Sequence, residues 1–250
     1  MGKSTVSVNL ATALAASGAS VGLLDADIYG PSQGALLGIP EGTRPEVSGD
    51  KMKPIRAHGV VAMSMGFVTS ERTPAIWRGP MASGALQQLL TQTEWGELDY
   101  LIVDMPPGTG DIQLTLAQRV PLTGAVIVTT PQDIALLDAR KGIEMFRKVA
   151  VPVIGIVENM STHVCSSCGH EEAIFGSGGG EQVAVDYETV LLAQLALSMD
   201  IRMQSDEGTP ISISHPDAPV SQTFRDIAAK VQTFVSEQVV RAPVINIMDD

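Results

Sequence analysis

The chain has 250 residues, with 16 Lys and Arg against 28 Asp and Glu, a net charge of −12, and only two Cys. The length suits a single α/β domain with a buried core, and the ordinary apolar content of 44% argues against disorder or a disulfide scaffold. The net negative charge argues against a protein that binds the phosphate backbone of nucleic acids. No apolar stretch approaches the roughly 18 residues of a membrane span. We therefore expect a cytoplasmic protein with no nucleic-acid or membrane partner.

Short apolar runs alternate with longer helical patterns along the chain. The first helix is expected over 4–17, with Val6, Leu10 and Leu14 on one side and Gly18 as its stop. Strands are expected over 21–24, 60–63, 100–103, 125–129, 153–157 and 190–195. Further helices are expected over 81–92, 111–118, 134–148, from about 181, and over 220–237. The Pro- and Gly-rich stretch 30–54 is expected to be a loop with little regular structure.

This alternation predicts a doubly wound, mostly parallel sheet with helices on both faces, because buried parallel strands read as continuous apolar runs. We expect one domain over residues 1–240, followed by an acidic tail over 241–250. Ligands of such sheets bind beyond the carboxyl ends of the strands. Asp25, Asp104 and Asn159 lie at or just after expected strand ends, so we expect them at the site.

The start of the chain carries half of a phosphate-binding motif. The full pattern is G-x-x-x-x-G-K-[ST] between a strand and a helix, and here Gly2-Lys3-Ser4-Thr5 opens directly into the first helix. Lys3 can neutralise β- and γ-phosphate charge, Ser4 can hold Mg²⁺, and the helix start offers backbone N–H groups. The alternative is an ordinary solvated lysine at a chain start.

Two acidic segments favour the phosphate-binding interpretation. Asp25-Ala-Asp27 follows one expected strand, and Asp104-Met-Pro-Pro-Gly-Thr-Gly-Asp111 follows another. Asp104 suits an outer-shell magnesium ligand, Asp27 suits the residue that orients the attacking water, and the loop 108–110 is suited to sensing the γ-phosphate. The alternative for each Asp is a turn or a helix cap.

Both cysteines fall in one C-x-x-C motif, Cys165 and Cys168, after the strand and turn expected around Asn159. Four interpretations stay open: an inert pair, a thioredoxin-like redox pair, a zinc knuckle completed by His163 and His170, and half of a cluster site. In the last, two chains related by a two-fold axis supply the four thiolates that a [4Fe–4S] cluster requires.

On these motifs the chain resembles the Mrp-type iron–sulfur cluster carriers, within the MinD/ParA-like (SIMIBI) group of deviant P-loop ATPases. The segments that carry the resemblance are 2–5, 25–32, 77–80, 104–111, 129–132, 158–161 and 165–169. Tyr-Gly-Pro-Ser at 29–32 and the Cys165–Cys168 pair separate this family from its MinD, ParA and nitrogenase-reductase relatives.

The resemblance implies a homodimeric ATPase that carries a [4Fe–4S] cluster on Cys165 and Cys168, receives it from a cluster-assembly scaffold and delivers it to apo iron–sulfur proteins. It implies ATP and Mg²⁺ as cofactors. Lys3 and Asp27 are the implied catalytic residues, and Asn159 is implied to read adenine. Nucleotide state would then act as the switch for cluster release. Two other functions stay open: a MinD/ParA-like positioning ATPase, and a zinc-stabilised interaction module without catalysis.

The start of the chain departs from the family pattern. Family members carry a strand and then Gly-Lys-Gly-Gly-Val immediately before Gly-Lys-Ser-Thr, whereas Met1 stands here where that Val would be. We therefore expect a truncated phosphate loop and a sheet without its first, central strand. From a chain starting at Met1 we expect weak ATP binding and poor hydrolysis, because several phosphate-facing N–H donors are absent. Residues 77–80 are expected at a dimer surface or in a turn with a packed Trp.

Overall fold

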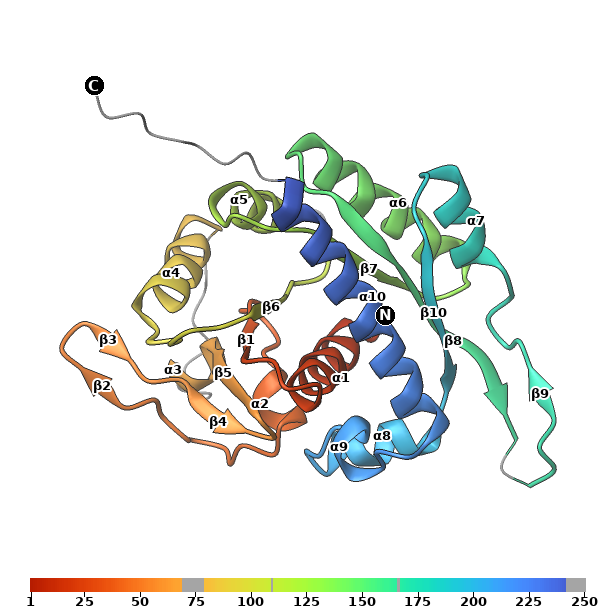
Figure 1. Ribbon diagram of the computed structural model, residues 1–250, viewed down its shortest axis with the longest axis horizontal. Helices are drawn as coiled ribbons and strands as arrows, with labels where there is room; N and C mark the ends of the chain where they lie inside the picture. Colours follow the sequence, from red (N-terminus) through yellow and green to blue (C-terminus); the bar gives the residue numbers. More distant parts are fainter. Residues whose placement is uncertain (69–78, 109, 166, 242–250) are drawn as a thin grey trace.

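The computed structural model describes residues 1–68, 79–108, 110–165 and 167–241, in which strands and helices alternate (Figure 1). The strands are β1 (Val21–Asp25), β2 (Val47–Ser48), β3 (Lys51–Met52), β4 (Ile55–Ala57), β5 (Val60–Ser64), β6 (Tyr100–Asp104), β7 (Ala125–Thr129), β8 (Val153–Val164), β9 (Glu171–Glu172) and β10 (Leu191–Leu197). The helices are α1 (Lys3–Ala16), α2 (Gln33–Leu36), α3 (Met65–Val68), α4 (Gly79–Gln92), α5 (Asp111–Arg119), α6 (Asp133–Lys148), α7 (Gly179–Asp186), α8 (Met199–Asp206), α9 (Ile211–Ser214) and α10 (Pro219–Arg241).

Two parallel sheets form the centre of the fold. The first has the order β4-β5-β1-β6, in which only β4 is antiparallel to its neighbour, and the second has the order β10-β8-β7, with β9 antiparallel to β8. Helices α1 and α10 pack together on one side, whereas α6 and α7 pack on β7 and β8 from the other (Figure 1). The expected doubly wound α/β class is confirmed.

The division into two sheets falls between β6 and β7. Within the described residues, neither strand pairs with anything along its outer edge. The apolar residues of β6 are only half-buried, whereas β1 and β5 are buried along their whole length.

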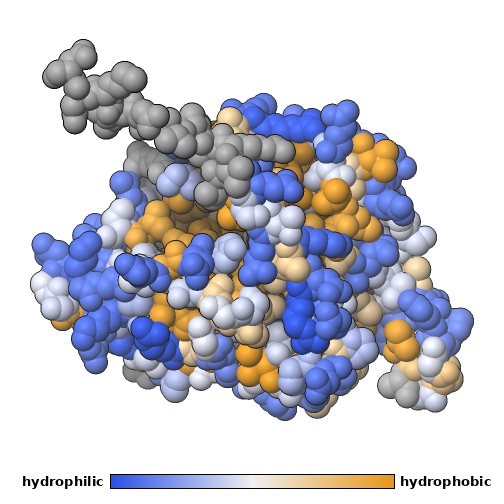
Figure 2. All heavy atoms as spheres, in the orientation of Figure 1, coloured by the Kyte–Doolittle hydropathy of each residue, from blue (hydrophilic) through white to orange (hydrophobic). Residues whose placement is uncertain are grey.

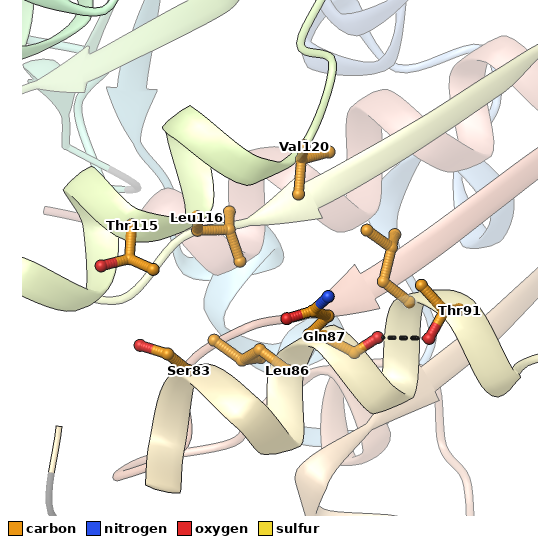
Figure 3. Close-up of a pocket in the computed structure, with 8 residues that line it drawn as sticks. Ser83, Leu86, Gln87, Thr91, Thr115, Leu116 and Val120 are labelled. Atoms are coloured by element: carbon orange, nitrogen blue, oxygen red, sulfur yellow. Dashed lines mark hydrogen bonds between the residues drawn. The ribbon is translucent and has the colours of Figure 1, made fainter. Parts of the chain in front are cut away.

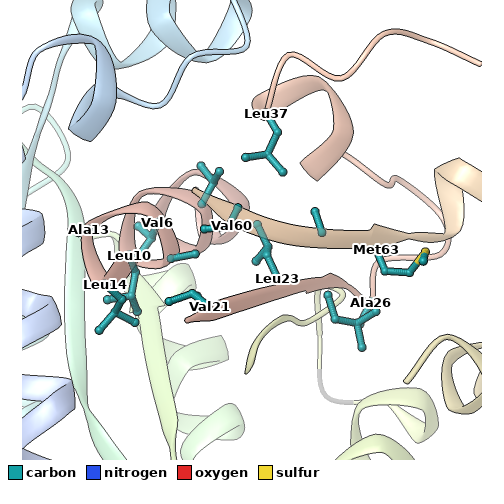
Figure 4. Packing of buried hydrophobic residues seen from close by; sticks show 14 of the residues in the cluster. Val6, Leu10, Ala13, Leu14, Val21, Leu23, Ala26, Leu37, Val60 and Met63 are labelled. Atoms are coloured by element: carbon teal, nitrogen blue, oxygen red, sulfur yellow. The ribbon is translucent and has the colours of Figure 1, made fainter. Parts of the chain in front are cut away.

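Helix α1 is the central helix of the larger core. Val6, Leu10 and Leu14 are buried as expected, and they face Val21 and Leu23 of β1 (Figure 4). The opposite side of α1 is also buried, because α10 packs against it. An apolar helix enclosed on all sides is fixed in position, so its first turn is presented at a defined place relative to the strand ends.

Two segments differ from the sequence expectations. Residues 30–54 are not simply a loop: they contain the one-turn helix α2 and the β2–β3 hairpin, whose surface is hydrophilic (Figure 2). Strand β8 continues from Val153 to Val164 instead of ending near 157, because β10 and β9 pair with its second half. Asn159 therefore lies inside a strand, next to Met160, whose φ of 55° interrupts its regularity.

Some predictions fall outside the described residues. These are residues 242–250 of the tail expected over 241–250, Trp77 and Arg78 of the 77–80 segment, Thr109 of the loop 108–110, and Ser166 of the 165–169 segment. Gly79 and Pro80 open α4. The division into a domain over 1–240 and a separate tail stays a prediction.

Candidate functional site

The N-terminus of α1 is an open helix end. Gly2 occupies the N-cap position with φ 81°, no side chain caps the helix, and its first turn contains no acidic residue. The positive φ favours glycine, and a Cβ built on Gly2 would lie 2.1 Å from Nδ2 of Asn159, so any other residue would displace the Asn159 amide. Lys3, Ser4 and Thr5 form the first turn. Such an end, with free N–H groups and an adjacent lysine, is suited to binding an anion.

A row of polar side chains crosses the carboxyl ends of three parallel strands. Asp25 of β1 lies in register with Ser64 of β5 on one side and Asp104 of β6 on the other. All three are buried, with exposures of 0–1%. The sequence predicted that Asp25 and Asp104 would meet at this edge, and the structure confirms it.

Asp25 holds the chain that follows β1. Its Oδ2 accepts hydrogen bonds from the backbone N–H groups of Ser32 (2.9 Å) and Gln33 (3.0 Å) and from the hydroxyl of Ser64 (3.1 Å). Burial, with a further contribution from the Asp104 carboxylate, raises the pKa of Asp25 to about 6, although these donors favour the ionised form. The sequence placed Asp25 at this edge, and a helix cap was the alternative role that it left open for each Asp.

Asp104 is linked to α1 by two side chains. Its Oδ1 accepts a hydrogen bond from the Ser7 hydroxyl (3.1 Å), and its Oδ2 accepts one from Nε2 of Gln33 (2.8 Å). The same Gln33 Nε2 also donates to the carbonyl oxygen of Ser4 (3.1 Å). Ser7 and Gln33 were missed from the sequence, because neither belongs to a recognisable motif.

Asp27 lies in the loop between β1 and α2. Its Oδ1 accepts hydrogen bonds from the backbone N–H groups of Tyr29 and Gly30, each over 3.2 Å. This is the local turn that the alternative interpretation anticipated, and it fixes the carboxylate at the same end of β1 as Asp25. The water-orienting role of Asp27 stays a prediction.

Asn159 lies against the start of α1. Its Nδ2 donates a hydrogen bond to the carbonyl oxygen of Met1 over 3.1 Å. The structure thus brings Asn159 to the same place as Gly2 and Lys3, as expected, through a contact with the backbone. Its neighbour Glu158 is fully buried and accepts hydrogen bonds from the N–H of Gly180 (2.6 Å) and from Nε2 of Gln194 (2.9 Å).

A large groove leads away from this helix end. It has a volume of about 1050 Å³ and runs between the segment after β6, strand β7 and helix α6. Lys3 is among its lining residues, and Phe146 and Phe175 contribute apolar surface. The volume is ample for a nucleotide, whose base suits apolar walls while its phosphates suit the helix end.

A second cleft, between α4 and α5, is too small for such a ligand. Its volume is about 70 Å³, and leucines and a valine supply most of its wall (Figure 3). The hydrogen bond drawn there, from the Thr91 hydroxyl to the carbonyl of Gln87, lies within α4. We assign no ligand to this cleft.

The two cysteines lie on a hairpin that projects from the end of β8, away from the α1 N-terminus (Figure 1). Hydrogen bonds from Cys165 N to the His170 carbonyl (2.9 Å) and from Gly169 N to the Cys165 carbonyl (2.8 Å) close the turn. Cys165 is half-buried and Cys168 is exposed, and both are free thiols. Hydrogen bonds from the backbone N–H groups of Ser167 and Cys168 lower the pKa of the Cys165 thiol.

The described residues contain no group of three or more His, Cys, Asp or Glu side chains that could hold a metal ion. His163 and His170 therefore do not form, with the two cysteines, the four-ligand zinc site that one interpretation required. Two thiols alone are an incomplete metal site, and any cluster bound here needs ligands from elsewhere.

Among the described helices, none combines the length and the apolarity that crossing a membrane requires.

The fold and the helix-end site define a P-loop NTPase. The family described as ParA, NUBPL iron-transfer P-loop NTPase, matches residues 1–232, and the chain belongs to this family. Two relatives are named iron–sulfur cluster carrier protein: one from Pseudomonas fragi, 62% identical over 91% of this chain and 80% of its own length, and one from Escherichia coli K12, 56% identical over 92% and 63%. The chain thus spans less than two thirds of the E. coli relative.

A solved structure has a similar fold. It is a nucleotide-binding protein from Archaeoglobus fulgidus in complex with ADP, with a TM-score of 0.72 and 37% identity over 83% of this chain and 81% of that one. The cell-division ATPase MinD of Pyrococcus furiosus, at 20% identity and a TM-score of 0.68 over 93% of both chains, shares the fold. The expected relationship to iron–sulfur carriers and to the MinD/ParA fold is confirmed.

Proposed function

We propose that this chain is an ATP-dependent iron–sulfur cluster carrier, which holds a [4Fe–4S] cluster between two copies and transfers it to apo-proteins. The cluster is the cargo, and it arrives from a cluster-assembly scaffold. The observation that carries the proposal is the thiol pair on a projecting hairpin, with no third metal ligand beside it among the described residues.

The hairpin is suited to a cargo that must be released. Each copy supplies two thiolates, and two copies supply the four that the cluster requires. N–H groups aimed at Cys165 stabilise its thiolate, the form that binds iron. Val164, which precedes Cys165, is about half exposed, and a second copy would cover it. A cluster held at an exposed tip by only two ligands from each side is open to exchange.

The α1 N-terminus is the proposed ATP site. Lys3 neutralises phosphate charge, and the N–H groups of the first turn, from Gly2 to Thr5, hold phosphate oxygens. The donors present fit Mg²⁺, because the Ser4 hydroxyl and the Asp104 carboxylate are hard oxygen ligands and a buried carboxamide oxygen of Gln33 lies unpaired nearby. Bound Mg²⁺ would neutralise charge on the phosphates.

The remaining residues orient the reactants. Asp27, fixed by its turn, orients the attacking water toward the γ-phosphate and accepts a proton from that water. Asn159 holds the backbone before α1 and reads adenine. Because β8 carries Asn159 in its middle and leads directly to Cys165, a change at the nucleotide is transmitted along one strand to the cluster hairpin.

Anaerobic reconstitution with iron and sulfide tests this function. We expect a brown protein that donates its cluster to an apo iron–sulfur protein, and loss of both properties in Cys165→Ala and Cys168→Ala. Ser167→Ala on the same turn is the matched control, since it keeps the backbone N–H and removes only the smaller hydrogen bond from the Ser167 hydroxyl to Cys165, and it should retain both. Zinc in place of iron would support an interaction module instead, and cluster binding by the double cysteine variant would contradict the proposal.

A further inference from the structure

The described residues contain only two buried side-chain polar atoms without a hydrogen-bond partner, Oε1 of Gln33 and Nδ1 of His163. Gln33 is fully buried. A buried carbonyl oxygen without a partner costs free energy comparable to a lost hydrogen bond, so an atom in this state points to a bound water or ion as its partner.

The orientation of the Gln33 carboxamide is fixed by its neighbours. Its Nε2 lies 3.1 Å from the Ser4 carbonyl oxygen and 2.8 Å from Asp104 Oδ2, and both of these atoms are acceptors. Turning the amide over would place an oxygen against both, so Nε2 is the atom that contacts them and Oε1 is the atom left without a partner. In this orientation of the Gln33 carboxamide, Oε1 is therefore the unpaired atom.

The position of the unpaired oxygen indicates what binds it. The carboxamide bridges the first turn of α1 and the end of β6, the two elements that would hold phosphate and metal. Each oxygen of Asp104 already accepts one hydrogen bond. Mg²⁺ gives up its water shell reluctantly and usually keeps several waters, and these need acceptors.

We propose that Oε1 of Gln33 accepts a hydrogen bond from a water molecule bound to the Mg²⁺ of the nucleotide. Gln33 is thus a positioning residue: it sets the metal's hydration shell while its Nε2 holds Asp104 and α1 in place. This inference rests on the proposed ATP site, and it adds to that site a residue outside the recognised motifs.

The test separates metal positioning from structural support. ADP affinity is measured by isothermal titration, with Mg²⁺ and with EDTA, for the unmodified chain, for Gln33→Met and for Ser7→Ala, the control that removes the other hydrogen bond to Asp104. We expect Gln33→Met to reduce the gain in affinity from Mg²⁺ by about 5- to 10-fold, the size expected for one ordinary hydrogen bond, in addition to any loss that the variant shows in EDTA. Ser7→Ala should retain the gain.

An equal loss of affinity with and without Mg²⁺ in Gln33→Met would overturn the inference and leave only a structural bridge. If the unmodified chain gains no affinity from Mg²⁺, the proposed ATP site fails as well, and the two failures are thereby distinguished. A second measurement needs no variant: the side-chain amide resonance of Gln33, in protein labelled with ¹⁵N-glutamine, should shift when Mg²⁺ joins the ADP complex. An unchanged resonance would contradict the inference.

Discussion

Asn159 donates a hydrogen bond from Nδ2 to the carbonyl oxygen of Met1 over 3.1 Å, between residues 158 positions apart in the chain. This contact joins β8, the strand that leads to Cys165, to the backbone that opens α1. It is the direct link between the proposed nucleotide site and the strand of the cluster hairpin, and it makes coupling between them testable.

We expect Asn159→Ala to uncouple the two sites. In the unmodified, reconstituted chain, ATP should change the rate at which a chelator removes iron, and in the variant this effect should be largely lost because β8 no longer bonds to the α1 start. Ser161→Ala, which removes a hydrogen bond from the same strand to the Leu195 carbonyl, is the matched control. An unaltered ATP effect in Asn159→Ala would rule out this route.

The same variant tests adenine recognition. If Asn159 also reads the base, Asn159→Ala should bind ATP about 10-fold more weakly, the cost of one or two hydrogen bonds, and should discriminate less against GTP. Competition binding with the two nucleotides measures this. Equal weakening for both would assign Asn159 to holding the Met1 backbone alone.

Gly2→Ala should impair the helix start more than a comparable glycine change elsewhere. Its φ of 81° is strained for alanine, and its Cβ would meet the Asn159 amide at 2.1 Å. Gly18→Ala is the matched control: its φ is 97°, but nothing lies within 4 Å of its Cβ. We expect each to lose about 1–2 kcal/mol of unfolding free energy from backbone strain, and Gly2→Ala to lose more.

Urea unfolding of both variants measures this difference. Adding Asn159→Ala to Gly2→Ala should recover the excess loss, because the clashing atom is removed. Equal losses in Gly2→Ala and Gly18→Ala would show that the approach of Asn159 to Gly2 is not tight.

Asp25 should make stability depend on pH. Burial and the Asp104 carboxylate raise its pKa from 3.8 to about 6. The folded chain therefore binds this proton more tightly than the unfolded chain does, so the stabilising contribution is complete below 3.8 and is lost as the pH rises through 6. A shift of about two pH units corresponds to roughly 3 kcal/mol.

The measurement compares unfolding free energies of the unmodified chain and Asp25→Asn across this pH range. Residues that titrate alike in both proteins cancel in the difference between their unfolding free energies. The unfolding free energy of the unmodified chain should therefore fall by roughly 3 kcal/mol relative to that of the variant as the pH rises from about 4 to about 6.5. Parallel pH curves for the two proteins would show that Asp25 has an ordinary pKa in the folded chain.

Much of the fold could be predicted from sequence, because its elements carry strong local patterns. The continuous apolar runs of β1 and β7 and the periodic pattern of α6 predicted their types and nearly their ends. Helix α2 and the extension of β8 were missed for a physical reason. Asp25 caps α2 from eight residues away, and β8 is prolonged by its pairing with β9 and β10, so both depend on tertiary contacts.

The site was predictable to the extent that its residues belong to motifs. Asp25 and Asp104 were placed together because parallel strands end at one edge, and Lys3 was placed at the site because its motif opens a helix. Gln33 was not, since a glutamine after Pro-Ser carries no signal of its own, and its position under α1 follows only from the folded chain. The contact between Asn159 and Met1 could not be predicted from the sequence either.

The account depends most directly on two chains sharing one cluster, and anaerobic native mass spectrometry of the reconstituted protein measures this. We predict a dimer that carries about four iron atoms and four sulfides per two chains. In Cys168→Ala the iron should be lost. A monomer that retains a full cluster, or a dimer that carries zinc and no iron, would contradict the account.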